Sequence, residues 1–292
     1  MGTLYVVATP IGNLEDVTLR ALRVLREAEL VLAEDTRHTR ILLDRHAIAA
    51  RPLSLHAHNE AARITRVLEA LAMGGRVALV SDAGTPLVSD PGERLVAAVI
   101  AAGHRVEAVP GPSAVLAALA VAGLPMTSFA FAGFLPRRAG ERDAWLVAWR
   151  ERTETLVLFE SPRRVGATLG RMAEILGDRQ ACVARELTKL HEEAARGTLL
   201  ELASKFSTGA RGEVTIVVGG CLRETAGGTG ADPDGAQDAA LDAEIGAQLA
   251  AGEKTRTIAA RLSLQYGVPR REIYARALEI REREGSRSQE RG

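Results

Sequence analysis

Short apolar runs, each followed by a loop rich in Gly, Pro or charged residues, recur along the first three quarters of the chain. Runs of β-branched and apolar residues bounded by turn residues predict buried strands that end in ordered loops. These predicted strands are residues 4–8, 30–33, 52–56, 77–80, 105–109, 128–134, 155–159, 181–184 and 213–219.

Amphipathic segments separate many of these strands. Residues 18–28, 93–102 and 115–122 carry apolar side chains three and four positions apart, which predicts helices that each turn one face toward a core. Strands that alternate with helices are typical of an α/β fold. The length of 292 residues corresponds to about two domains, which we place at 1–113 and 114–222.

The C-terminal quarter has a different pattern. Residues 223–237 are rich in Gly, Asp and Thr without periodicity, which predicts a linker. A helical segment at 238–283 follows, and its last two helices, joined by Gly-Val-Pro, resemble a helix-turn-helix. Its charges nearly balance, which does not favour DNA binding. We expect residues 284–292 to be a disordered tail.

Composition narrows the function classes. The net charge is zero, so no strong field indicates nucleic acid or membrane as a partner. No apolar run is long enough to span a bilayer, and no signal peptide is evident at the start, so we expect a cytoplasmic protein without membrane contact. His56, His58 and Glu60 are metal-ligand types, but their spacing lacks the HExxH form and no further cluster exists. We therefore predict no metal site and a polar or helix-capping role for these three residues.

Two kinds of loop follow the predicted strands. Loops at 9–13, 81–92 and 110–114 are rich in Gly, Pro and small residues, which bring backbone groups close to a ligand. The chain has no GxGxxG after its first strand and no GxxxxGK[ST] or GxSxG motif, so these loops favour an uncharged or zwitterionic small molecule. Loops at 34–40, 137–138, 161–164 and 185–189 carry charges instead. They suit either phosphate contacts or ordinary surface ion pairs, and the first also suits a helix start capped by Asp35 or Thr36.

Eight motifs in order carry a resemblance to a known family. They read TPIGNLEDVTLRAL, LAEDTRHTRILL, SLHAHNE, VSDAGTPLVSDPG, VPGPSA, LVLFESPRRV, ARELTKLHEE and GEVTIVVGG. Together they resemble the ribosomal RNA small subunit methyltransferase I family of the tetrapyrrole methylase superfamily, the class III S-adenosylmethionine-dependent methyltransferases. Corrin-precursor methylases of this superfamily usually read GxGPG and GDP where this chain reads ATPIG and SDAGTP, which favours the RNA branch.

The resemblance implies a fold, a cofactor and partners. It implies two α/β domains with S-adenosylmethionine in the cleft between them, a homodimer, and 2′-O-methylation of a cytidine in the decoding region of 16S ribosomal RNA, with the RNA expected as a partner within the 30S subunit. The cofactor positions carried over by motif are Pro10, Ser81, Asp82, Gly84, Thr85, Val88, Ser113, Ala114, Phe159, Val214 and Thr215.

Methyl transfer to a ribose hydroxyl benefits from a general base or a nearby cation. The candidate bases are Glu34, Asp35, Glu160 and Glu186, and the sequence does not choose among them. Arg37 and Lys189 are candidate catalytic cations. The candidate RNA ligands are Arg137, Arg138, Arg163, Arg164 and Arg185.

Two other functions stay open at this point. One is a methyltransferase that acts on a tetrapyrrole or another small molecule. The other is a non-catalytic protein that binds the cofactor and regulates a partner through its C-terminal helices. In the main hypothesis, those helices assist contact with RNA or with the ribosomal subunit.

Overall fold

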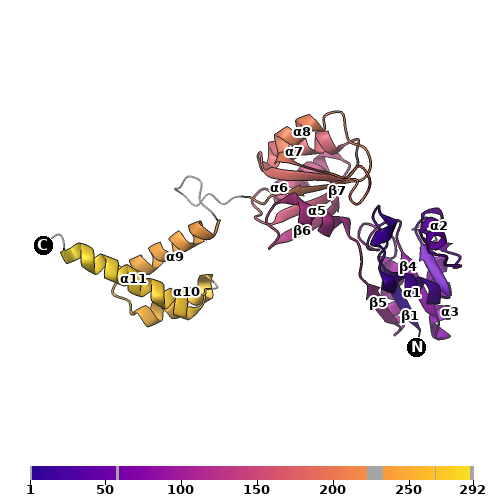
Figure 1. The fold of residues 1–292 in the computed structure, drawn as a ribbon, viewed down its shortest axis with the longest axis horizontal. Coiled ribbons are helices and arrows are strands. Elements are labelled where there is room, and N and C mark those ends of the chain that lie inside the picture. Colours follow the sequence, from indigo (N-terminus) through magenta and orange to yellow (C-terminus); the bar gives the residue numbers. More distant parts are fainter. Residues whose placement is uncertain (1, 57–58, 222–232, 267, 290–292) are drawn as a thin grey trace. The chain divides into compact units, whose positions relative to one another are not determined.

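The computed structural model describes residues 2–56, 59–221, 233–266 and 268–289. Met1–Arg223 forms one compact unit and Glu224–Gly292 forms a second. The first unit holds two five-stranded sheets, and the second holds the C-terminal helices (Figure 1). Over the described residues, no helix combines the length and the apolar character needed to cross a membrane.

The first sheet is wholly parallel. Its strands are β1 (Thr3–Val7), β2 (Leu30–Ala33), β3 (Leu53–Ser54), β4 (Arg76–Val80) and β5 (Arg105–Val109). Their order across the sheet is β3-β2-β4-β1-β5. Because parallel strands all end at one edge, the loops that follow β1, β2, β4 and β5 gather there.

Helices cover both faces of this sheet, as its continuous apolar strands require. The covering helices are α1 (Leu19–Glu27), α2 (Thr36–Arg45), α3 (Glu60–Ala72) and α4 (Glu93–Ala101). Alternate residues of β4 serve the two sides: Ala78 and Val80 pack with α1 and α2, whereas Val77 and Leu79 pack with α3 and α4. The strand period of two therefore divides the core into two layers.

The second sheet is mixed. It contains β6 (Phe129–Phe134), β7 (Thr155–Glu160), β8 (Gln180–Arg185), β9 (Glu193–Thr198) and β10 (Val214–Val218) in the order β6-β7-β10-β8-β9. Strand β6 runs parallel to β7, whereas β10 is antiparallel to β7 and β8. On one face lie α6 (Ala139–Ala148), α7 (Val165–Leu176) and α8 (Leu199–Lys205), of which α7 and α8 are adjacent.

The other face of the second sheet is covered by α5 (Ala114–Ala122). Ile11, from the loop that follows β1, joins this cluster and is 7% exposed. A residue of the first sheet's loop thus completes a core of the second sheet. The loop after β1 therefore packs directly against the core of the second sheet.

One strand and one helix in this half of the first unit were not predicted from the sequence. Strand β9 reads Glu-Ala-Ala-Arg-Gly-Thr, which lacks β-branched and apolar alternation, and it forms because β8 offers it a free edge. Helix α8 begins with a capping box in which Thr198 and Glu201 satisfy each other's backbone N–H groups. That signature is visible in the sequence and would have predicted the helix start.

The C-terminal unit is a three-helix arrangement. Helices α9 (Pro233–Ala250), α10 (Thr255–Tyr266) and α11 (Arg270–Gln289) share a core that includes Leu241, Ile258 and Ile273. Most of the predicted linker, residues 222–232, lies outside the described part of the chain, as do residues 290–292 of the predicted tail. The expected tail from 284 is corrected up to Gln289, because extending an existing helix adds one hydrogen bond per residue.

Candidate active site

A pocket of about 480 Å³ opens where loops from both sheets meet, and this volume suits a small-molecule ligand. From the first sheet it is lined by Ile11, Glu34, Asp82, Ala83, Gly84, Thr85, Val88, Ser89 and Asp90. The segment around α5 adds Ser113, Ala114 and Val115. From the second sheet come Phe134, Phe159, Glu160, Ser161, Pro162, Gly212, Glu213, Val214 and Thr215.

Backbone hydrogen bonds tie the first-sheet loops together. The N–H of Thr9 donates to the carbonyl of Gly84 at 2.8 Å, and the N–H of Gly84 donates back to the carbonyl of Thr9 at 3.0 Å. The hydroxyl of Thr85 donates to the carbonyl of Pro112 at 3.3 Å. The loops after β1, β4 and β5 therefore form one connected wall of the pocket.

The loop after β4 has an unusual backbone. Gly84 has φ +78°, and a Cβ there would lie 3.2 Å from Cγ2 of Ile11, so both conformation and space favour glycine. Leu87 and Ser89 also have positive φ values, 74° and 72°. Residues other than glycine rarely adopt positive φ values, and those that do often cluster at ligand sites. The positive φ values make this loop a candidate for contact with a ligand.

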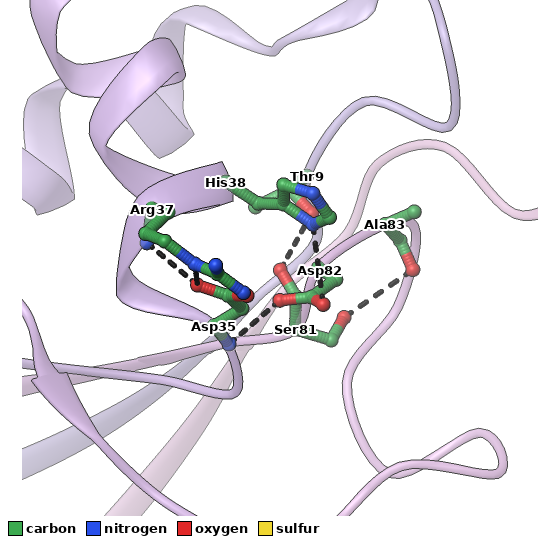
Figure 2. A network of polar contacts seen from close by, with 7 residues as sticks. All are labelled: Thr9, Asp35, Arg37, His38, Ser81, Asp82 and Ala83. Atoms are coloured by element: carbon green, nitrogen blue, oxygen red, sulfur yellow. Dashed lines mark hydrogen bonds and ion pairs between the residues drawn. The ribbon is translucent and has the colours of Figure 1, made fainter.

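Asp82 links the loop after β4 to the loop after β2. Its carboxylate accepts the backbone N–H of Asp35 at 2.7 Å and lies 3.3 Å from Nδ1 of His38. Figure 2 shows both groups directed at the Asp82 carboxylate, with Arg37 turned toward Asp35 instead. Asp35 caps α2 by accepting the N–H of Arg37. Its pKa lies below the ordinary value because of its hydrogen bonds with Arg37.

The pocket lining is acidic. It contains Glu34, Asp82, Asp90, Glu160 and Glu213 and no Arg or Lys. Burial, then the charges of Asp90 and Asp82, raise the pKa of Glu34 above its ordinary value. Burial also raises the pKa of Asp90, and Asp82 adds to the effect although a hydrogen bond from Ser81 opposes it. Such a pocket favours a ligand with positive charge.

The second-sheet side of the pocket is held firmly in place. Glu160 is 3% exposed; its carboxylate accepts the N–H of Ser161 at 2.7 Å and the hydroxyl of Thr168 at 2.6 Å. Arg164 lies 3.6 Å from the same carboxylate. With both oxygens engaged, Glu160 stabilises the start of the loop after β7.

A second polar cluster lies beside Glu213. The ammonium of Lys189 donates to Glu186 at 2.8 Å and to Glu213 at 2.9 Å. Burial lowers the pKa of Lys189, but these hydrogen bonds outweigh it, so its pKa lies above the ordinary value. The N–H of Asn13 donates to the hydroxyl of Thr188 at 2.9 Å, which joins this loop to the loop after β1.

The predicted cofactor residues mostly come together. Nine of them line the pocket: Asp82, Gly84, Thr85, Val88, Ser113, Ala114, Phe159, Val214 and Thr215. Pro10 and Ser81 are buried and do not line it. The hydroxyl of Ser81 donates to the carbonyl of Ala83 at 3.3 Å, so its contact is with the pocket loop.

The predicted catalytic residues separate into two groups. Glu34 lines the pocket, whereas Asp35, Arg37 and Lys189 do not. Arg37 has a side chain that is 87% exposed and pairs with Asp35. Lys189 is engaged by two carboxylates, one of which belongs to the lining residue Glu213.

The predicted RNA ligands also differ in their surroundings. Arg138 pairs with Glu141 at 3.0 Å, and Arg185 pairs with Glu193 at 2.6 Å. Arg164 is half-buried against Glu160. Arg137 and Arg163 are exposed and have no ion pair among the residues that the structure describes. Among the five predicted RNA ligands, only Arg137 and Arg163 have guanidinium groups without an ion pair to a described residue.

Sequence reasoning missed several pocket residues. Phe134, Asp90 and Glu213 line the pocket although no role was predicted for them. Asp90 lies in the Pro/Gly loop after β4, and Phe134 ends a predicted strand, so position at a strand end was a usable signal. No group of three or more His, Cys, Asp or Glu could hold a metal ion in the described ranges, and His58 lies outside them.

The sequence of this chain matches a known protein family and several named proteins. Residues 3–203 match the family Tetrapyrrole (Corrin/Porphyrin) Methylases. The chain is 46% identical over 285 residues to ribosomal RNA small subunit methyltransferase I of Mesorhizobium japonicum, covering 97% of this chain and 93% of the relative. It is 48% identical over 221 residues to the protein of the same name from Thermotoga maritima, covering 75% and 99%.

A solved structure has the same fold. Uroporphyrin-III C-methyltransferase from Thermus thermophilus, complexed with S-adenyl homocysteine, superposes with a TM-score of 0.53 at 23% identity, over 75% of this chain and 97% of that one. The sequence matches and the shared fold point to the same family. The chain belongs to the tetrapyrrole methylase family and, within it, to the ribosomal RNA small subunit methyltransferase I proteins.

Proposed function

We propose that this protein transfers the methyl group of S-adenosylmethionine to small-subunit ribosomal RNA, at the ribose 2′-hydroxyl of a cytidine in the decoding region. The acidic, cation-free lining of the pocket is the observation that carries the cofactor part. S-adenosylmethionine has a sulfonium and an ammonium group, both positive, and a single carboxylate. A phosphate ligand would meet only like charge on this lining.

The cofactor residues fit this ligand in size and chemistry. Backbone groups around Gly84 and the small side chains of Ser113 and Ala114 leave room for close approach. Phe159 and Val214 supply apolar surface on the opposite side. When bound, the cofactor supplies a methyl group activated by its sulfonium. The solved relative that holds S-adenyl homocysteine supports the same use of the fold.

Glu34 is the general base in this proposal. Of the four carboxylates considered from the sequence, Asp35 caps α2 and pairs with Arg37, and Glu160 is buried with both oxygens engaged. Glu186 accepts the ammonium of Lys189 and the N–H of Glu213. Glu34 lines the pocket and its pKa is raised, which makes its carboxylate a stronger base.

In the reaction, Glu34 accepts the proton of the attacking ribose hydroxyl. If S-adenosylmethionine were held by the residues around Gly84, it would supply the methyl group for displacement by the hydroxyl oxygen, with its carbon–sulfur electron pair left on sulfur. The part of the pocket walls would be to position the two reactants, since positioning accounts for much of the rate in such a displacement. The proton then leaves Glu34 for solvent.

The phosphate backbone of the RNA is held outside the acidic pocket. Strands β6 and β7 are parallel neighbours, so the loops after them, which carry Arg137 and Arg163, emerge at the same sheet edge. Ser161 and Pro162 of the second loop line the pocket. Exposed arginines at this edge suit phosphate contacts beside the reacting nucleotide. The names of the curated relatives support ribosomal RNA as the acceptor.

The homodimer, the cytoplasmic location, the assembled 30S particle as substrate and a role for α9, α10 and α11 in contacting it stay predictions from the family resemblance. Light scattering of the purified protein tests the dimer. Comparing 30S subunits with naked 16S RNA as methyl acceptors tests the form of the substrate.

The decisive experiment uses S-adenosylmethionine with a labelled methyl group. Purified protein should label 30S subunits or 16S RNA from cells that lack the protein, and mapping of 2′-O-methylation should locate one cytidine in the decoding region. Label transferred to precorrins instead would favour the tetrapyrrole alternative. Cofactor binding without transfer to any acceptor would favour the non-catalytic regulator.

A further inference from the structure

Phe134 is an exposed aromatic side chain at the pocket. It lines the pocket, yet 58% of its surface is accessible, in a chain where aromatic residues make up only 3%. An apolar ring left open beside a polar cavity suggests a ligand that covers it. Sequence reasoning assigned it no role, and the mechanism above does not use it.

An irregularity in β6 turns this ring toward the pocket. Phe131 pairs with Val157 and Phe134 pairs with Phe159, so three steps along β6 match two steps along β7. In a regular strand Phe131 and Phe134 would point to opposite faces. The extra residue brings both rings to the side of the sheet on which Phe159 lies. The ring centroid of Phe159 is 4.9 Å from that of Phe131 and 5.6 Å from that of Phe134.

Gly133 makes the irregularity possible. It has φ +63°, and a Cβ at this position would lie 3.2 Å from the hydroxyl of Ser89 in the strained loop after β4. Bulges with a glycine in this conformation re-aim side chains near active sites. Backbone conformation and close approach therefore both serve the placement of Phe134.

We propose that Phe134 is the stacking surface for the nucleobase of the acceptor nucleotide, an inference that rests on the proposed function. The ring of Phe159 packs beside it, with ring centroids 5.6 Å apart. Arg137 follows three residues later, exposed and positioned by sequence to meet a neighbouring phosphate. Aromatic stacking combined with arginine contacts to the backbone is the usual means of holding an unstacked RNA base.

The cofactor adenine is the competing occupant of this ring. Phe159 is only partly exposed and packs into the apolar cluster under α5, whereas Phe134 is the most exposed of the three rings. The predicted cofactor residues include Phe159 and do not include its neighbour Phe134. The more open position favours the ligand that arrives from solvent with the RNA.

The test replaces Phe134 by Ala, Leu, Tyr and Trp, with Phe129→Leu as the matched control. Phe129 is on the same strand, is 40% exposed and does not line the pocket. Three quantities are measured: affinity for S-adenosylhomocysteine by calorimetry, and KM and kcat with 30S subunits. Phe134→Ala should raise the RNA KM about 5- to 150-fold, the range that loss of one stacked base produces.

Phe134→Leu should behave like Phe134→Ala because it restores apolar bulk without a flat ring. Tyr and Trp should recover most of the affinity for RNA, and S-adenosylhomocysteine affinity should stay within twofold in every variant. A parallel loss of S-adenosylhomocysteine affinity would assign the ring to the cofactor and overturn the inference. A wild-type KM in Phe134→Ala would overturn it as well, while leaving the proposed function intact. An inactive wild-type protein would instead reject the proposed function and, with it, this role.

Discussion

The backbone N–H of Asp35 donates to the carboxylate of Asp82 at 2.7 Å, which joins the loops that follow two neighbouring parallel strands. Together with the approach of His38 Nδ1 to the same carboxylate at 3.3 Å, this contact connects the charged loop that carries Glu34, the proposed base, with the Pro/Gly loop proposed to hold the cofactor. Because Asp82 also lines the pocket, its side chain affects both loop geometry and ligand contact.

Asp82→Ala should therefore weaken S-adenosylhomocysteine binding by about tenfold or more, since hydrogen bonds to charged groups contribute roughly 1.5–3 kcal/mol. Asp35→Asn is the control, because it removes the Arg37 ion pair but retains the backbone N–H that Asp82 accepts. Calorimetric titration of both variants measures the effect. Normal cofactor binding by Asp82→Ala would remove Asp82 from the cofactor site.

Glu34→Gln should lower kcat about 10²- to 10⁴-fold, the range that general base catalysis contributes, with little change in S-adenosylhomocysteine affinity. The wild-type rate should fall with decreasing pH as Glu34 takes up a proton. Since burial and the nearby carboxylates raise its pKa, this fall should begin above the ordinary value of 4.5. Single-turnover rates from pH 5 to 9 provide the measurement.

Glu34→Asp is the conservative control and should retain part of the rate and the pH dependence. If Glu34→Gln keeps the wild-type rate and pH profile, another group is the base. If it loses cofactor affinity instead, Glu34 is a cofactor ligand.

The raised pKa values of Glu34 and Asp90 also affect stability. A raised carboxyl pKa means that the folded state binds the proton more tightly than the unfolded state does, so stability falls as pH rises through the window between the two values. The double variant Glu34→Gln/Asp90→Asn should therefore have a higher Tm than wild type at pH 7. A domain of this size shifts by roughly 2–4 °C per kcal/mol.

Thermal unfolding at pH 7 and pH 4 measures this difference, which should shrink at the lower pH because wild type then carries the protons itself. Asp143→Asn tests the opposite sign. Hydrogen bonds from Arg171 lower the pKa of Asp143, so its removal should reduce the Tm at pH 7. If the double variant differed from wild type in Tm by the same amount at both pH values, the raised pKa values of Glu34 and Asp90 would not affect stability as predicted.

Gly12 sits against the loop that carries Lys189. A Cβ on Gly12 would lie 2.5 Å from Cγ of Lys189 and 2.8 Å from the carbonyl of Leu187, so Gly12→Ala must displace that loop. We expect a loss of roughly 1–3 kcal/mol of unfolding free energy, as for other overpacked sites. Weaker S-adenosylhomocysteine binding should accompany it.

Gly140→Ala is the matched control for Gly12→Ala. It lies in α6, where a Cβ would meet nothing within 4 Å. Alanine has the higher helix propensity, so this variant should be neutral or stabilising by up to about 1 kcal/mol. Urea unfolding compares the two, and equal stabilities would show that the loop near Lys189 accommodates the extra methyl group.

The neighbouring arginines 163 and 164 should respond differently. Arg163→Ala should weaken RNA binding and reduce the slope of log K against log salt by about one, as expected when one phosphate contact is lost. It should leave the Tm unchanged, because Arg163 is exposed. Arg164→Ala should lower the Tm, because buried Glu160 then loses its cation.

Filter binding at several salt concentrations, together with thermal unfolding, separates the two variants. A salt slope that Arg163→Ala leaves unaltered would exclude Arg163 as a phosphate ligand. Arg152→Ala offers a control for general loss of positive charge, since Arg152 lies over the ring of Trp149 instead of beside the pocket.

Local pattern determined most of the strands and helices. The apolar run at 77–80 and its Pro/Gly loop became β4 and the loop of Gly84, because burial of consecutive apolar residues and the need for positive φ are both local properties. The nine motif residues that line the pocket were likewise named from sequence, through the family resemblance. Strand β9 was missed because its stability comes from pairing with β8 instead of from its own residues.

Tertiary structure decided how these residues divide their roles. Glu34 and Glu160 lie at the ends of buried strands and both line the pocket. Only packing shows that burial and neighbouring carboxylates raise the pKa of Glu34, whereas Glu160 is 3% exposed with both carboxylate oxygens hydrogen-bonded. The orientation of Phe134 depends on a register shift against β7, which no period along a single strand reveals. Sequence therefore determined the elements and the loops, whereas contacts between distant segments determined which side chains meet at the site, because charge, burial and register are properties of neighbours in space.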